Sequence, residues 1–191
     1  MPRPALSRLL MPLTVATLGG VGLGCSGSLL GPAGYVNAID TVTLYALSGT
    51  AISFPSAYSM LDERVVRTDT TSQFDFAFDI TAAGAPLIYP AGALGLSREP
   101  GLQRSTRGFA DIKTALSEGY SSDSTLQMKA SDVFLARSRA SYIGCLYLGS
   151  VPRYGKFRVL GIDLAARSIT LETLVNLNCG FKNLEEGIPK S

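Results

Sequence analysis

Short stretches of the chain alternate between hydrophobic and polar residues, which is the pattern of β-strands with one buried face. The clearest is FDFAFDI at residues 74–80, where three Phe and one Ile alternate with two Asp and one Ala. This alternation predicts a strand whose apolar side chains enter a core. It also predicts that Asp75 and Asp79 lie on the solvated face of that strand.

Other stretches are rich in β-branched and aromatic residues, which favour strands. They are residues 41–47, 63–68, 132–138, 142–148, 156–164 and 168–176. Three residues separate the last two stretches, so we expect a hairpin there. Pro and Gly are frequent between residues 86 and 108, which indicates loops with at most one short strand. Residues 109–120 could hold one helical turn.

Closely spaced strands without intervening helices are typical of all-β domains. We therefore expect an all-β fold, either a single antiparallel sandwich or a partly open barrel, with at most one short helix. We place this domain at residues 40–185, followed by a C-terminal tail at 186–191. Residues 25–39 are mostly small, uncharged and interrupted by Gly and Pro, so they predict a flexible tether before the domain.

The beginning of the chain has the pattern of an export signal. Arg3 and Arg8 precede the fifteen uncharged residues 9–23, and Cys25 comes two positions later. The residues before Cys25 resemble a bacterial lipobox, in which a small residue precedes a Cys that is lipidated and becomes the first residue of the mature chain. The order of Gly and Leu before this Cys is the reverse of the usual one. The resemblance implies a lipoprotein-type signal peptide over residues 1–24 and a membrane anchor on Cys25.

Two other interpretations of this region stay open. The sequence VNA at residues 36–38 fits an ordinary signal peptidase, which would release a secreted or periplasmic protein after cleavage near Ala38. Residues 9–30 are 22 uncharged residues, enough to cross a membrane, although Pro12 and the many Gly residues disfavour a helix there.

Composition narrows the chemistry. The chain contains no His, which excludes Ser-His-Asp triads, Cys-His pairs and His metal ligands. We therefore expect neither an enzyme nor a metal or other cofactor. The net charge is +2, and without residues 1–24 there are 15 basic and 15 acidic residues, so nothing indicates a nucleic-acid partner.

The three Cys residues leave one over after any single pairing. If Cys25 carries a lipid, Cys145 and Cys179 remain, in a protein exported to an oxidising compartment. We therefore predict a disulfide between them, with two separate buried thiols as the alternative. Closing a loop of about 35 residues would stabilise the fold by roughly 3–4 kcal/mol.

Charged residues suggest two further hypotheses. Lys156 and Arg158 alternate with hydrophobic neighbours, and together with Arg153 they predict a solvated basic face. A carboxylate-based hydrolase would instead need two acids within about 10 Å of each other in a cleft. The candidates for that role are Asp69, Asp75 and Asp111.

Four stretches follow one another in the order seen in a known family. They are FDFAF at 74–78, VFLARS at 133–138, YGKFRV at 154–159 and ITLE at 169–172. This order resembles that of the HmuY-like lipoproteins, with Phe74 in place of the family's Trp. The resemblance implies an all-β, surface-anchored protein. That family captures haem through His ligands, which this chain lacks, so we do not extend haem binding to it.

These features together predict an exported, non-enzymatic β-domain of the bacterial cell envelope, anchored to a membrane by a lipid on Cys25. Its partner would be a protein or a small apolar ligand of unknown identity. One alternative is a surface carrier of a small apolar or tetrapyrrole ligand, which needs a deep apolar pocket among the strands. The other alternative is the carboxylate-based envelope hydrolase.

Overall fold

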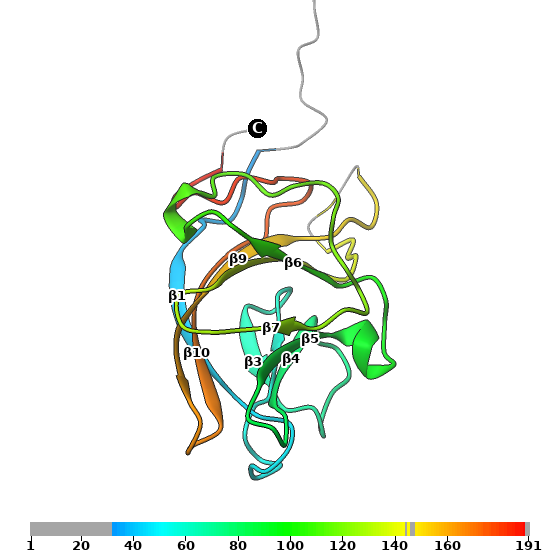
Figure 1. The fold of residues 1–191 in the computed structure, drawn as a ribbon. Coiled ribbons are helices and arrows are strands. Elements are labelled where there is room, and N and C mark those ends of the chain that lie inside the picture. Colours follow the sequence, from blue (N-terminus) through cyan, green and yellow to red (C-terminus); the bar gives the residue numbers. More distant parts are fainter. Residues whose placement is uncertain (1–31, 144, 146–147, 190–191) are drawn as a thin grey trace, which may run out of the picture.

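The computed structural model describes residues 32–143, 145 and 148–189. These residues fold into two antiparallel sheets of five strands each, packed face to face as a sandwich (Figure 1). The predicted all-β class is therefore confirmed. The only helical elements among the described residues are the short 3₁₀ turns η1 (Ala91–Leu94) and η2 (Phe109–Asp111), and η2 lies within the stretch predicted to hold a helical turn.

Each sheet has a simple strand order. The first sheet contains, from edge to edge, β1 (Ile39–Tyr45), β10 (Ser168–Asn176), β9 (Tyr154–Asp163), β8 (Val133–Arg137) and β6 (Gly101–Ser105). The second contains β3 (Arg64–Val66), β2 (Ala57–Ser59), β4 (Phe76–Ile80), β5 (Pro86–Pro90) and β7 (Leu126–Gln127). In Figure 1, β1 and β10 curve down one side of the molecule toward the second sheet.

The main core lies between the two sheets. Aromatic rings fill its centre: Phe76 of β4 packs edge-on against Phe134 and Phe157 of the opposite sheet, with centroids 5.6 and 5.0 Å away. Tyr58 of β2 completes the group, 5.5 Å from Phe76. Because alternate residues of a strand point to the same face, the alternation in 74–80 places Phe76, Phe78 and Ile80 in this core, as predicted.

The outer face of the first sheet is also covered, which the sequence did not predict. Side chains of β8, β9 and β10 pack there against the segment around η2 and against Leu184. Lys156 is therefore buried, and the predicted solvated position is wrong. Its Nζ donates to the carbonyl oxygens of Phe109 at 2.9 Å and Ile112 at 3.0 Å, and burial lowers its pKa. Arg158, on the same face, keeps 42% of its side chain exposed.

Most predicted strands are confirmed, with shifted ends. The stretch 168–176 coincides with β10, and 156–164 lies within two residues of β9, with which β10 forms the predicted hairpin. The short strands β2, β6 and β7 were not predicted, and the Pro- and Gly-rich stretch 86–108 holds two strands rather than one.

The strand predicted at residues 142–148 is wrong. Its described residues belong to no strand, although their composition is typical of one. They lie in a loop closed by an isolated bridge between Ser141 and Val151. Tyr142 and Ile143 point to solvent, since no neighbouring strand or loop covers them among the described residues.

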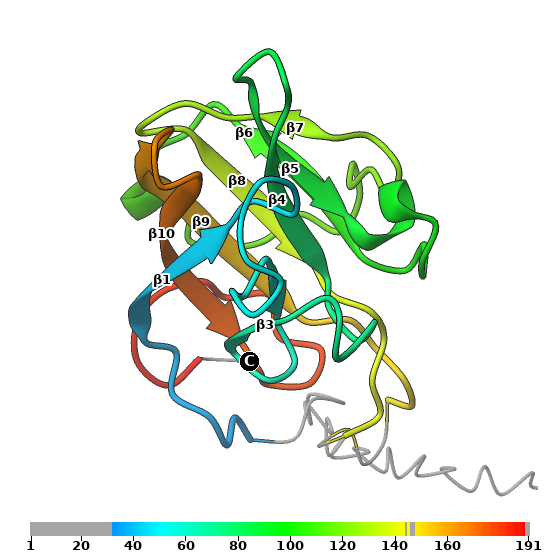
Figure 2. The same ribbon diagram turned by 90° about the horizontal axis from the view of Figure 1, so that it is seen from below.

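The two ends of the described chain lie together at one end of the sandwich, as Figure 2 shows from below. Asn37 forms a bridge with Gly187, and Ile39 opens β1 opposite Leu174. The fold therefore includes residues from the predicted tether, 25–39, and from the predicted tail. Its boundaries lie further out than residues 40 and 185.

Candidate functional site

The end of the sandwich where both chain ends meet carries most of the unusual polar contacts. We call it the clasp end. It comprises residues 34–39, 141–143, 145, 151–153, 176–179 and 183–188.

Asn178 holds the incoming chain at the clasp end. Its side-chain oxygen accepts hydrogen bonds from the N–H groups of Gly34 at 2.7 Å and Tyr35 at 2.9 Å. Its amide donates to the Tyr35 carbonyl at 2.8 Å and to the side-chain oxygen of Asn176 at 2.9 Å. One side chain thus satisfies three backbone groups of a segment 143 or more positions away.

Asn37 fixes the next part of that segment. Only 1% of this residue is exposed, and its amide donates to the carbonyls of Asn183 at 3.1 Å and Glu185 at 3.0 Å. Its backbone exchanges two 2.9 Å hydrogen bonds with Gly187. Because a buried donor without a partner costs about 1–3 kcal/mol, these bonds tie residues 34–37 to the folded domain, although the Asn37 Oδ1 atom is buried without a partner among the described residues.

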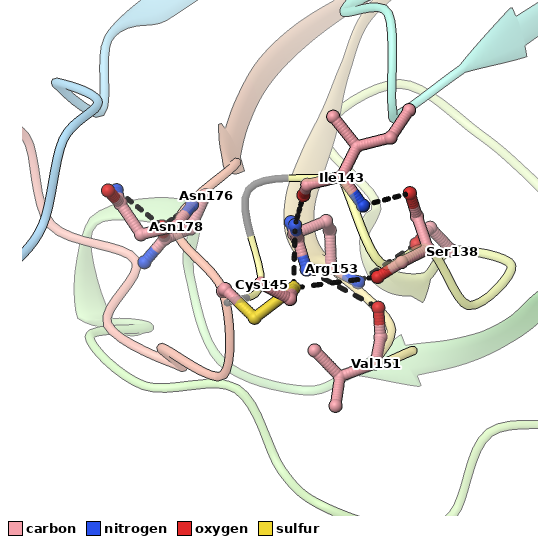
Figure 3. Close-up of a disulfide and its surroundings, with 9 residues drawn as sticks. Ser138, Ile143, Cys145, Val151, Arg153, Asn176 and Asn178 are labelled. Carbon is pink, nitrogen blue, oxygen red and sulfur yellow. Dashed lines mark hydrogen bonds between the residues drawn. A yellow bond between two sulfur atoms is a disulfide. The ribbon is translucent and has the colours of Figure 1, made fainter. Parts of the chain in front are cut away.

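The disulfide predicted between Cys145 and Cys179 is confirmed, with the two Cα atoms 5.3 Å apart (Figure 3). It joins the 141–151 loop to the chain that follows β10. The sulfur of Cys145 lies 3.3 Å from Nη2 of Arg153, and the Cys145 N–H donates to the Tyr142 carbonyl at 3.0 Å.

Arg153 is the buried charge of the clasp end, so its predicted place on a solvated face is wrong. Its guanidinium points into the loop in Figure 3 and donates to the carbonyls of Ile143 at 2.7 Å and Val151 at 3.3 Å. Burial lowers the pKa of Arg153, yet a guanidinium keeps its charge at every physiological pH. Backbone carbonyl dipoles thus stabilise this cation and shape the loop.

Asp75 is buried as well, which contradicts the predicted solvated strand face. It accepts the N–H groups of Met60 at 2.7 Å and Arg139 at 2.8 Å, and the Arg139 guanidinium lies 3.4 Å away. Burial raises the pKa of this carboxyl, against the opposing effect of its hydrogen bonds and of Arg139. Asp75 precedes β4 and Arg139 follows β8, so the pair links the two sheets. Asp79 is only partly exposed and accepts from Ser48 at 2.8 Å.

The three acids proposed for a hydrolase lie in three different settings. Asp75 is enclosed by its partners, and Asp69 forms an exposed ion pair with Arg67. Asp111 belongs to η2, which packs over β9 on the outer face of the first sheet. None of the three lines the open cleft beside β3 (Arg64–Val66).

An open cleft of about 580 Å³ lies beside the edge strand β3. Its lining residues are mostly polar or charged: Ser53, Pro55, Asp62, Arg64, Val65, Val66, Arg67, Thr70, Thr71 and Gln73. This cleft could not be predicted from the sequence, because its walls come from a loop, a three-residue strand and a turn that meet only in the fold. The lining includes positively charged, negatively charged and neutral polar side chains, which suit a polar partner surface.

Neither a metal centre nor a membrane-crossing helix occurs in the part of the chain that the structure describes. No three His, Cys, Asp or Glu side chains gather there closely enough to hold a metal ion. No described helix has the length and apolarity to span a bilayer. Cys25 and the predicted signal peptide, residues 1–24, lie outside the described residues.

Comparison of the chain with protein-family models, with curated proteins and with solved structures finds no match in any of the three. The resemblance to HmuY-like lipoproteins therefore stays a prediction.

Proposed function

We propose that this chain is a non-enzymatic β-domain of the bacterial cell envelope, anchored to a membrane by a lipid on Cys25, where it binds a partner. The observation that carries the proposal is the way residues 34–37 are held in the fold. The mature chain needs these residues, so its processing site lies before them. Cys25 is the upstream residue at which the leader has the pattern of a lipobox.

Cleavage near Ala38 fits this arrangement poorly. It would remove Asn37 with its two side-chain hydrogen bonds and its bridge to Gly187. It would also leave Asn178 without the backbone groups of Gly34 and Tyr35. A signal peptidase site is normally an accessible segment outside the folded domain, which favours the Cys25 site.

The disulfide supports export. Disulfides persist in oxidising compartments such as the periplasm or the cell surface and are rare in the cytosol. Cys145 and Cys179 are bonded, so the leader and the pairing of the Cys residues support the same destination.

Partner binding is favoured over carriage of an apolar ligand. The centre of the sandwich, where a small apolar ligand would be expected, is filled by the rings of Tyr58, Phe76, Phe134 and Phe157. The open cleft beside β3 instead presents Asp62, Arg64, Arg67 and neutral polar groups next to two Val side chains. A polar partner surface would suit it better than a tetrapyrrole or a fatty chain.

The test is the intact mass of the full chain purified from the membranes of a bacterial host. We expect Cys25 to be the first residue and to carry acyl chains, with a mass two hydrogens below that of the reduced form. The matched control is Cys25→Ser, which should lose the acyl mass and leave the membrane fraction while keeping the disulfide.

A mature chain that begins at any other residue, or at an unmodified Cys25, would overturn the proposed anchor. An absorbance spectrum of the same preparation addresses the alternative. A colourless protein supports partner binding, whereas a bound pigment would favour the tetrapyrrole carrier.

A further inference from the structure

Six large hydrophobic side chains at the clasp end are exposed to solvent, the least of them Ile39 at 41%. Tyr142 and Ile143 are 76% and 73% exposed, and Tyr35, Val36 and Ile188 are 53%, 63% and 57% exposed. A contiguous group of exposed hydrophobic residues is typical of a contact surface. The opposite end also exposes Ile52, Phe54 and Leu164, at 74%, 44% and 59%, so the proposed anchor decides between the two ends.

Hydrogen bonds and the disulfide link the segments that carry the five most exposed of these residues. Tyr35 is hydrogen-bonded to Asn178, whose neighbour Cys179 is linked to the loop of Tyr142 and Ile143 by the disulfide. Val36 precedes Asn37, which bridges to Gly187, the neighbour of Ile188. Figures 1 and 2 both show the two ends of the described chain and the described residues of the 141–151 loop at the same end of the sandwich.

The proposed lipid anchor lies immediately upstream of this group. Ten positions separate Cys25 from Tyr35, and a fully extended chain of that length reaches at most about 35 Å. A domain of this size is about 40 Å across. The tether therefore holds the clasp end within about 35 Å of the proposed anchor, so this end of the domain is the one that the anchor brings nearest to the membrane.

We propose that the clasp end docks on the lipid bilayer, with Tyr35, Tyr142 and Ile143 in the headgroup region. This inference rests on the proposed lipid anchor and adds a second contact to it. Tyr suits the interface because its ring is apolar and its hydroxyl stays hydrated.

The docking is apolar rather than electrostatic. The cation of the clasp end, Arg153, is buried and donates inward, so it offers no charge to anionic lipids. Among the described residues next to Ile188, Glu185 and Glu186 are exposed, and Glu185 forms an exposed ion pair with Lys113. Binding should therefore occur on neutral phosphatidylcholine and should depend little on salt.

The opposite end of the domain provides a matched control. Ile52 is 74% exposed, close to the 76% of Tyr142, and it lies in the loop after β1, at the bottom of Figure 1. The natural chain contains no Trp, so a single introduced Trp reports only its own surroundings.

The experiment compares Tyr142→Trp with Ile52→Trp in the full lipidated chain, reconstituted on phosphatidylcholine vesicles with and without bromine-labelled acyl chains. We expect the emission of Tyr142→Trp to shift to shorter wavelength and to fall about twofold or more with the brominated lipid. The emission of Ile52→Trp should stay unchanged. Both sites are exposed, so neither variant should disturb folding.

Equal quenching of the two variants, or quenching of neither, would overturn the docking surface while the anchor stands. If intact mass instead shows no lipid, the proposed anchor fails, and the same vesicles are added to the unlipidated protein. Selective quenching of Tyr142→Trp would then support docking without an anchor, and its absence would overturn docking too.

Discussion

The interior of the sandwich and its clasp end are stabilised in different ways. Between the sheets, rings such as Phe76 and Phe157 pack without any hydrogen-bonding requirement. At the clasp end, Arg153, Asn178 and Asn37 each bond backbone groups that no strand partner satisfies. Hydrophobic packing tolerates many side chains of suitable volume, whereas a buried polar contact needs one donor in one place.

The hydrophobic interior therefore stabilises the fold, whereas the polar contacts of the clasp end attach residues 34–37, at the end of the predicted tether, to the domain. The interior would form whether or not the chain was anchored. The clasp end secures the segment that leads to the proposed lipid, and its disulfide ties that segment's partner, Asn178, to the neighbouring loop through Cys179. Substitutions in the two regions should therefore have distinguishable consequences.

The largest effect should come from the interior. Phe76→Ala removes a fully buried ring that contacts Tyr58, Phe134 and Phe157, and we expect the free energy of unfolding to fall by about 3–5 kcal/mol. Urea denaturation of the oxidised protein measures it. Ile52→Ala, at an exposed site, should change it by less than about 0.5 kcal/mol. A loss no larger than that of the control would show that the ring cluster does not hold the sandwich together.

The second effect tests the covalent link of the clasp end. The double variant Cys145→Ser, Cys179→Ser should lose about 3–4 kcal/mol, because the unfolded chain regains the freedom of a loop of about 35 residues. Wild-type protein treated with dithiothreitol provides the comparison and should unfold at the same urea concentration as the variant. A variant as stable as oxidised wild type would contradict a stabilising role for the bond.

A smaller effect should follow from Arg153→Lys. A single ammonium cannot reach both the Ile143 and the Val151 carbonyls in the geometry of a guanidinium, so we expect a loss of about 2 kcal/mol. The control is Arg98→Lys, in an exposed ion pair with Asp123, where about 0.5 kcal/mol or less is expected. Equal losses in both variants would mean that the buried position adds nothing.

The smallest effect concerns pH and the link between the sheets. Burial raises the pKa of Asp75, so the folded protein holds this proton more tightly than the unfolded chain does. Stability from this group is present below the unfolded pKa, near about 4, and is lost as the pH rises through the folded value. Relative to Asp75→Asn, wild type should lose at most about 1.4 kcal/mol per pH unit across that window. Urea denaturation of both proteins from about pH 3 to 8 measures the slope, and an opposite slope would show that Arg139 outweighs burial.

The interior could be predicted from the sequence because strand periodicity is local. The alternation at residues 74–80 identifies the core face of β4, and the β-branched residues of 168–176 define β10. The disulfide could be predicted by elimination, since Cys25 is predicted to carry a lipid and two Cys residues then remain.

The clasp end could not be predicted, because its contacts join distant parts of the chain. Lys156 shows the same limit on the outer face: its alternation is that of a solvated strand face, yet its cover comes from residues 44 and 47 positions earlier. The composition of 142–148 favours a strand, but a strand also needs a partner with free hydrogen-bonding groups. Nothing near Arg153 in sequence indicates that its acceptors are carbonyls.

The position of β1 has a mechanical consequence. If the tether is held at a membrane while a partner pulls on the far end of the domain, the load enters at residue 34 and runs along β1. That strand pairs with β10 over seven residues, so the load would shear the whole ladder at once rather than peel it one pair at a time. The hydrogen bonds of the Asn178 side chain would break first and lengthen the free chain, before the stronger pairing of β1 with β10 carries the load.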